Sequence, residues 1–108
     1  MTWKLWLDDV RNPKIHARLE YYQEWEEEKY IWALNTVQAV YYVLMWGPPE
    51  FMALDHDLGG SETTIDFLKW LQEKYPDCPP GYACHTANPV GRENMISFME
   101  SWKKSLDL

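Results

Sequence analysis

The sequence has little cysteine, no long apolar run and too few basic residues to balance its acidic ones. Its two cysteines, Cys78 and Cys84, are too few for a disulfide framework, and their spacing matches no familiar zinc motif. No apolar run approaches the roughly 20 residues that span a bilayer, and the start matches no signal peptide, so we expect a cytoplasmic chain without a membrane partner. The formal charge of −7 disfavours double-stranded DNA as a partner, because such binding depends on Lys and Arg.

The apolar residues that are present fall into short runs. Of the 108 residues, 46% are hydrophobic, which predicts one globular domain over residues 1–108. Four runs end in turn residues, at 3–7, 30–34, 51–54 and 82–86. Short runs of this kind, without polar alternation, are typical of buried parallel strands.

Helical patterns lie between these runs. The first has Val37, Val40, Tyr41 and Leu44 on one face, with Asn35 or Thr36 as its cap and Gly47 at its end. The second has Ile65, Leu68, Leu71 and Tyr75, and the third has Met95, Met99, Trp102 and Leu106 after an Asn88 cap and Pro89. Residues 14–29 suggest a further amphipathic helix. Strands and helices that alternate in this way predict an α/β fold, a parallel sheet with helices on both faces.

Acidic residues follow two of the predicted strands. Asp8 and Asp9 come directly after residues 3–7, and Asp55 and Asp57 come directly after residues 51–54. If these strands are neighbours, the carboxylates converge at the edge where such sheets bind ligands. Several carboxylates in one place favour a hard cation, Mg²⁺ or Mn²⁺. The alternative is that each pair only forms a turn and a helix cap.

The residues after the last predicted strand suit an anion. Thr86 lies at the strand end, Asn88 caps the next helix, and Arg92 lies in its first turn. A helix N-terminus beside an arginine binds phosphate groups readily, and Thr86 offers a hydroxyl. An ordinary helix start with a solvent-facing arginine is the alternative. His56 and His85, at the same edge, are candidate acid–base groups, although a histidine in a strand is often only a hydrogen-bonded core residue.

Four segments together resemble the cyclic-phosphate processing receiver-like domains. They are LWLDDVRNP from Leu5, ALDHDLG from Ala53, DFLKWL from Asp66 and HTANPVGRENM from His85. The resemblance implies a receiver-like, flavodoxin-like three-layer sandwich with a mostly parallel sheet of about four strands. It also implies that Asp8, Asp9 and Asp55 hold a metal together with the backbone carbonyl of Asp57, and that Thr86 matches the hydroxyl position.

The chain departs from an ordinary receiver in three ways. We expect the fifth strand and its phosphate-pairing lysine to be missing, and Arg92 is the residue that would supply that charge. The segment 14–29 is longer than the usual link, and Thr64 stands where the family tends to have glycine.

Our first hypothesis is a metal-dependent phosphodiesterase that opens a cyclic phosphate on a nucleotide or RNA end. Asp55, His56, His85 and Arg92 would be catalytic, Thr86, Asn88 and Arg92 would bind substrate, and Asp8, Asp9, Asp55 and Asp57 would bind Mg²⁺ or Mn²⁺. The alternatives are a module that binds a cyclic nucleotide or a protein without catalysis, and a receiver in which Asp55 accepts a phosphoryl group. The sequence leaves the particular cyclic phosphate, the metal, the host pathway and the oligomeric state open.

Overall fold

The computed structural model describes residues 3–9, 30–55, 63–86 and 88–106. Within them strands and helices alternate, as the sequence predicted. In chain order they are β1 (Lys4–Leu7), β2 (Tyr30–Ala33), α2 (Thr36–Trp46), β3 (Phe51–Leu54), α3 (Thr64–Lys74), β4 (Gly81–Cys84) and α4 (Pro89–Ser105). In these parts of the chain, no helix is long and apolar enough to cross a membrane.

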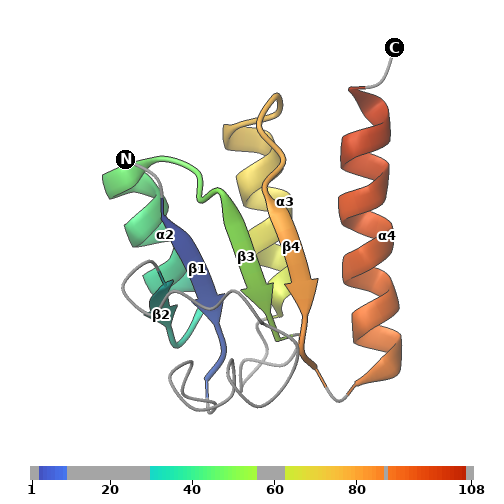
Figure 1. Cartoon of the computed structure of the whole chain (residues 1–108), viewed down its shortest axis with the longest axis horizontal. Helices are drawn as coiled ribbons and strands as arrows, with labels where there is room; N and C mark the ends of the chain where they lie inside the picture. The colour runs from blue at the N-terminus through green and yellow to red at the C-terminus, as the bar shows by residue number, and fades with distance from the viewer. Residues whose placement is uncertain (1–2, 10–29, 56–62, 87, 107–108) are drawn as a thin grey trace.

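The strands form one parallel sheet in the order β2-β1-β3-β4. β1 and β3 are therefore neighbours at its centre, which confirms the adjacency on which the predicted acidic site depends. Leu7 pairs with both Ala33 and Leu54, and Leu54 pairs with Cys84, so the four strands end level with one another. Figure 1 shows the four arrowheads pointing to the same edge.

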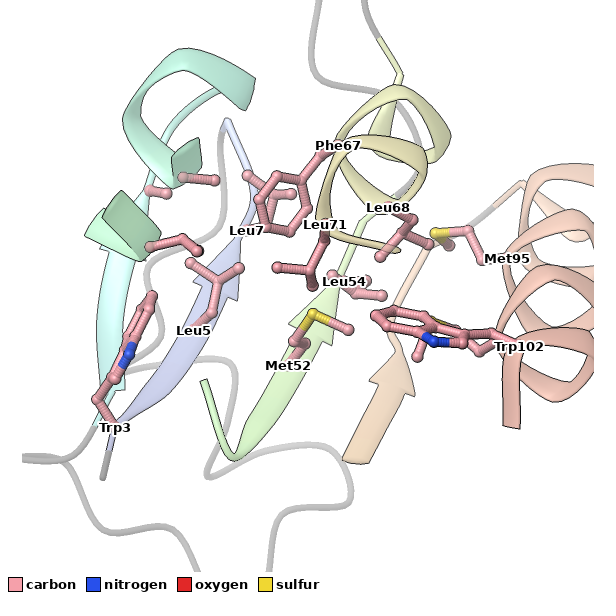
Figure 2. Close-up of a cluster of buried hydrophobic side chains, with 14 residues drawn as sticks. Trp3, Leu5, Leu7, Met52, Leu54, Phe67, Leu68, Leu71, Met95 and Trp102 are labelled. Atoms are coloured by element: carbon pink, nitrogen blue, oxygen red, sulfur yellow. The ribbon is translucent and has the colours of Figure 1, made fainter. Parts of the chain in front are cut away.

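One face of the sheet carries the main core. Leu5 and Leu7 of β1 and Met52 and Leu54 of β3 have no solvent exposure, and Figure 2 shows them directed toward the helices. The helices contribute their own buried residues to the same cluster, which are Ala39, Val43, Phe67, Leu68, Leu71, Met95, Met99 and Trp102. At about 1.5–3 kcal/mol for each large apolar side chain removed from water, this cluster is the main source of stability in the described fold.

The opposite face holds a smaller aromatic cluster. Trp6 and Ala53 are fully buried there, with Tyr30 and Trp32 packed against them. All three described helices contribute to the main core instead. The predicted helix within 14–29 lies outside the described residues.

The helix termini were predicted more accurately than the buried face of α2. Asn35 caps α2 and Asn88 caps α4, with Pro89 at its first position. Gly47 ends α2 with a φ of 84°, a left-handed value that glycine adopts without strain. However, Val37, Tyr41 and Leu44 are 69%, 57% and 58% exposed, so the predicted core face of α2 is wrong.

The reason is the composition of α2. Its sequence, TVQAVYYVLMW, has no charged residue to mark the solvent side, so apolar spacing alone could not select the face. The smaller residues Ala39 and Val43 are the ones that pack against the sheet. The predicted core position Leu106 is also wrong, since it caps α4 and is 43% exposed.

Candidate functional site

Three carboxylates meet at the carboxyl edge of the two central strands. One oxygen from each of Asp8, Asp9 and Asp55 can be chosen so that the three atoms all lie within 4.8 Å of one another. Asp8 and Asp9 follow β1 and Asp55 follows β3, so the parallel pairing of these strands brings them together. The structure thus gathers the three acidic residues that the sequence placed in one site.

The backbone of these residues continues the sheet by one step. Asp8 donates its N–H to the Ala33 carbonyl at 3.1 Å, and Asp55 donates to the Leu7 carbonyl at 2.9 Å. His85 donates to the Leu54 carbonyl, also at 2.9 Å. The strand predicted over 82–86 ends two residues earlier, at Cys84, yet this hydrogen bond keeps His85 in line with the sheet.

Asp8 is a buried carboxylate paired with a histidine. Its exposure is 0%, and its Oδ2 lies 2.9 Å from Nε2 of His85, which is itself buried. The His85 ring stacks on Trp6, with ring centres 4.4 Å apart and planes inclined by 13°. A carboxylate removed from water needs hydrogen bonds of this kind, because an unpaired buried charge is costly.

A second contact fixes the main chain at Asp8. The indole Nε1 of Trp32 donates to the backbone carbonyl oxygen of Asp8 at 2.7 Å. Trp32 lies on β2, beside Trp6 in the register of the sheet. Asp8 is therefore held at its N–H by Ala33, at its carbonyl by Trp32 and at its side chain by His85.

Asp55 is held from the helix that follows it. Thr64, a buried residue at the start of α3, donates its hydroxyl to the backbone carbonyl oxygen of Asp55. Asp66 takes part in the capping of α3, since its Oδ2 accepts the Thr63 N–H at 3.1 Å. Asp66 thus has the helix-terminal role that its position indicates.

The start of α4 uses most of its own donors. Asn88 accepts the Gly91 N–H through Oδ1 at 3.0 Å, and its carbonyl accepts the Arg92 N–H at 2.9 Å. Pro89 has no N–H, so among the described hydrogen bonds only the Val90 N–H of this turn is unused. The role of this helix N-terminus as an anion site stays a prediction.

Thr86, before the Asn88 cap, and Arg92, in the first turn of α4, make different contacts. The Thr86 oxygen accepts the Asn88 N–H at 3.1 Å, which leaves its own proton to donate. Arg92 is exposed, and within the described residues it makes no ion pair with the acidic cluster. Burial raises the pKa of the Cys84 thiol, and the positive charge of Arg92 acts in the opposite direction.

Two predicted site residues, His56 and Asp57, lie outside the described residues, so their roles stay predictions. The predicted roles of Thr86, Asn88 and Arg92 in substrate binding stay predictions too. The sequence reasoning missed Trp32, Trp6 and Thr64, which hold Asp8, His85 and Asp55. A signal for Trp32 was available, because it lies one residue before the end of the strand that pairs with β1.

Comparison with known proteins agrees with the fold. A crystal structure of a two component transcriptional regulator AraC from Clostridium phytofermentans ISDg has a similar fold, with a TM-score of 0.58 and 16% sequence identity. The match covers 99% of this chain and 96% of that one. No curated protein matches the sequence. The family model of the cyclic-phosphate processing receiver domain matches residues 3–101, and the chain therefore belongs to that family.

Proposed function

We propose that this protein is a metal-dependent phosphodiesterase that opens a cyclic phosphate on a nucleotide or an RNA end. The observation that carries the proposal is the meeting of Asp8, Asp9 and Asp55 at the carboxyl edge of the two central strands. Parallel α/β sheets bind ligands at this edge. Membership of a family named for cyclic-phosphate processing supports the choice of substrate.

The three carboxylates fit a small divalent cation. Two oxygens bound to one Mg²⁺ at about 2.0–2.1 Å are at most about 4.2 Å apart. The candidate oxygens lie within 4.8 Å of one another, so a small side-chain adjustment would let them share the ion. Carboxylates are the ligands that Mg²⁺ and Mn²⁺ prefer. Asp8, Asp9 and Asp55 would hold the ion, with the carbonyl of Asp57 as a further ligand. When bound, the ion supplies positive charge that polarises a phosphoryl oxygen and makes water a stronger nucleophile.

The reaction needs proton transfer and charge stabilisation from the chain. Water adds to phosphorus, one of the two ester P–O bonds of the ring breaks, and the departing oxygen takes a proton. The Thr86 hydroxyl donates a hydrogen bond to a phosphoryl oxygen, and Arg92 supplies positive charge to the anionic phosphate. His56 follows Asp55 directly in the sequence and is the candidate for moving the proton.

His85 has a different part in this scheme from the acid–base role that the sequence suggested. Its ring is buried, stacks on Trp6 and is bonded to Asp8. A group so enclosed is poorly placed to exchange protons with substrate and well placed to orient a carboxylate. We therefore assign His85 to the positioning of Asp8.

A substrate screen with matched variants tests the proposal. Cyclic mononucleotides, cyclic dinucleotides and RNA with a 2′,3′-cyclic end would be incubated with Mg²⁺ or Mn²⁺. We expect ring opening of at least one substrate, abolished by EDTA or by Asp55→Asn. Asp77→Asn makes the same chemical change at an exposed position away from the cluster, and it should retain full turnover. Full turnover by Asp55→Asn, or in EDTA, would remove the metal site from the mechanism.

The same preparations separate the two alternatives. Tight binding with the cyclic ligand recovered intact would indicate a binding module. A phosphoacceptor receiver is the other candidate, because the similar crystal structure is that of a two component regulator. Acetyl phosphate with Mg²⁺ would then add the mass of one phosphoryl group to the wild-type chain and none to Asp55→Asn.

A further inference from the structure

The peptide group between Asp8 and Asp9 accepts a hydrogen bond from an indole. Asp8 and Asp9 share a peptide group made of the Asp8 carbonyl and the Asp9 N–H. The Trp32 indole donates to that carbonyl at 2.7 Å. Because the peptide group is planar, fixing its carbonyl fixes the direction in which the chain continues to Asp9.

Trp32 acts on the site from a rigid position. It belongs to β2, which pairs with β1 over its whole length, and its ring packs with the cluster of Trp6 and Ala53. The side chain of Asp8 is held separately by His85. The Trp32 contact thus adds a hydrogen bond at the Asp8 carbonyl to those that the sheet makes at its N–H and His85 makes at its carboxylate.

We propose that Trp32 is a positioning residue for the cation site, orienting the Asp8–Asp9 peptide group so that both carboxylates face one ion. This inference rests on the metal dependence in the proposed function and adds a residue to that site. Groups that orient metal ligands typically change metal affinity by about 10–100-fold when they are replaced. The proposal concerns affinity for the ion and does not require any particular substrate.

The chain offers a close control. The Trp102 indole also donates to a backbone carbonyl, that of Pro76, at 2.8 Å. Trp102 is buried in the main core on α4, on the face of the sheet opposite Trp32. Trp102→Phe thus removes the same kind of hydrogen bond, from a more buried ring, without touching the Asp8–Asp9 peptide group.

The test is calorimetric titration of the full chain with Mn²⁺ and Mg²⁺. We expect Trp32→Phe to weaken binding by about 10–100-fold and Trp102→Phe to leave it within about twofold of wild type. Equal affinity of Trp32→Phe and wild type would overturn the inference, as would a wild-type chain that binds neither ion. Ion binding without cyclic-phosphate turnover would overturn the proposed function and leave this inference standing.

A second measurement uses the unmodified protein. In a ¹⁵N-labelled sample, the indole N–H signal of Trp32, identified by its loss in Trp32→Phe, is followed as Mg²⁺ is added. We expect it to shift with the same saturation as the calorimetric isotherm, while the Trp102 indole signal stays in place. A Trp32 signal that does not move at saturating Mg²⁺ would contradict the positioning role.

Discussion

At the scale of single residues, Asp8 is both fully buried and part of the acidic cluster. Its carboxylate has no solvent exposure and is bonded to His85, while its main chain is bonded to Ala33 and Trp32. Asp9 and Asp55, by contrast, are more accessible. In the proposed metal site, a buried and supported Asp8 beside the more accessible Asp9 and Asp55 would set the geometry in advance and leave the substrate side open.

Tyr30 gives a prediction at this scale. Burial, with a smaller effect of Glu50, raises the pKa of Tyr30 from 10.0 to about 12. Burial and a hydrogen bond to Glu100 likewise raise the pKa of Tyr82 to about 12. Between pH 10 and 12 the unfolded chain has lost tyrosine protons that the folded chain keeps, so the free energy of unfolding falls as the pH rises.

We expect Tyr30→Phe to lose less stability than wild type over this interval, as measured by urea unfolding at both limits. Tyr41→Phe makes the same chemical change at a position that is 57% exposed and serves as the control. Identical slopes for Tyr30→Phe and wild type would show that Tyr30 does not contribute to the alkaline loss.

At the scale of elements, two asparagine caps provide a matched pair. The Asn35 side chain accepts the Gln38 N–H at 2.9 Å, and the Asn88 side chain accepts the Gly91 N–H at 3.0 Å. Replacing such a cap by alanine typically costs about 1 kcal/mol. We expect Asn35→Ala and Asn88→Ala to lower the free energy of unfolding by about this amount each.

The two variants differ in their expected effect on turnover. Asn88 lies beside Thr86 at the predicted substrate corner, whereas Asn35 begins α2. Cyclic-phosphate turnover, measured below the unfolding range, should therefore fall for Asn88→Ala and not for Asn35→Ala. An equal effect of both variants would limit Asn88 to its capping role.

The sequence predicted the elements well wherever a local signal existed. Short apolar runs that stop at Asp8 and Asp55 located β1 and β3, and Asn88-Pro89 located the start of α4. The buried face of α2 was missed because Val37, Tyr41 and Leu44 are as apolar as the residues that pack inward. Packing against the sheet, which is a tertiary effect, decides the face in such a helix.

The same distinction applies to the site. The three carboxylates could be predicted because each comes directly after a strand, and parallel strands end at one edge. The position of Trp32 near the end of a predicted strand was available from the sequence, but the hydrogen bonds from Trp32 and Thr64 were not, since each depends on which side chain reaches across to a neighbouring backbone. His85 was predicted at the right edge, but its burial against Trp6 was not.

At the scale of the whole molecule, the acidic cluster opposes folding. Two unit charges 4 Å apart repel by about 4 kcal/mol at an effective dielectric constant of about 20, and the net charge of −7 adds to this. The main hydrophobic core must offset that repulsion. Without a cation, removing one of the three charges should therefore stabilise the fold.

We expect Asp9→Asn to raise the melting temperature in EDTA by several degrees, the effect of about 1 kcal/mol in a domain of this size. Mg²⁺ should raise the melting temperature of wild type. At a Mg²⁺ concentration 100 times the dissociation constant, binding adds about 2.7 kcal/mol to the free energy of unfolding. Mg²⁺ should raise the melting temperature of Asp9→Asn much less. Thermal unfolding with and without Mg²⁺ tests both, and a lower melting temperature for Asp9→Asn in EDTA would contradict the repulsion argument.

The hydrogen bonds that extend the sheet past each strand have a kinetic consequence. Because Asp8, Asp55 and His85 are tied through their N–H groups to Ala33, Leu7 and Leu54, the backbone at these three positions is set before an ion arrives. Ion capture should then be limited by the slow shedding of water from Mg²⁺ and not by rearrangement of the chain. An ion of similar size that loses its water faster than Mg²⁺ should therefore bind to the acidic cluster faster and with the same geometry.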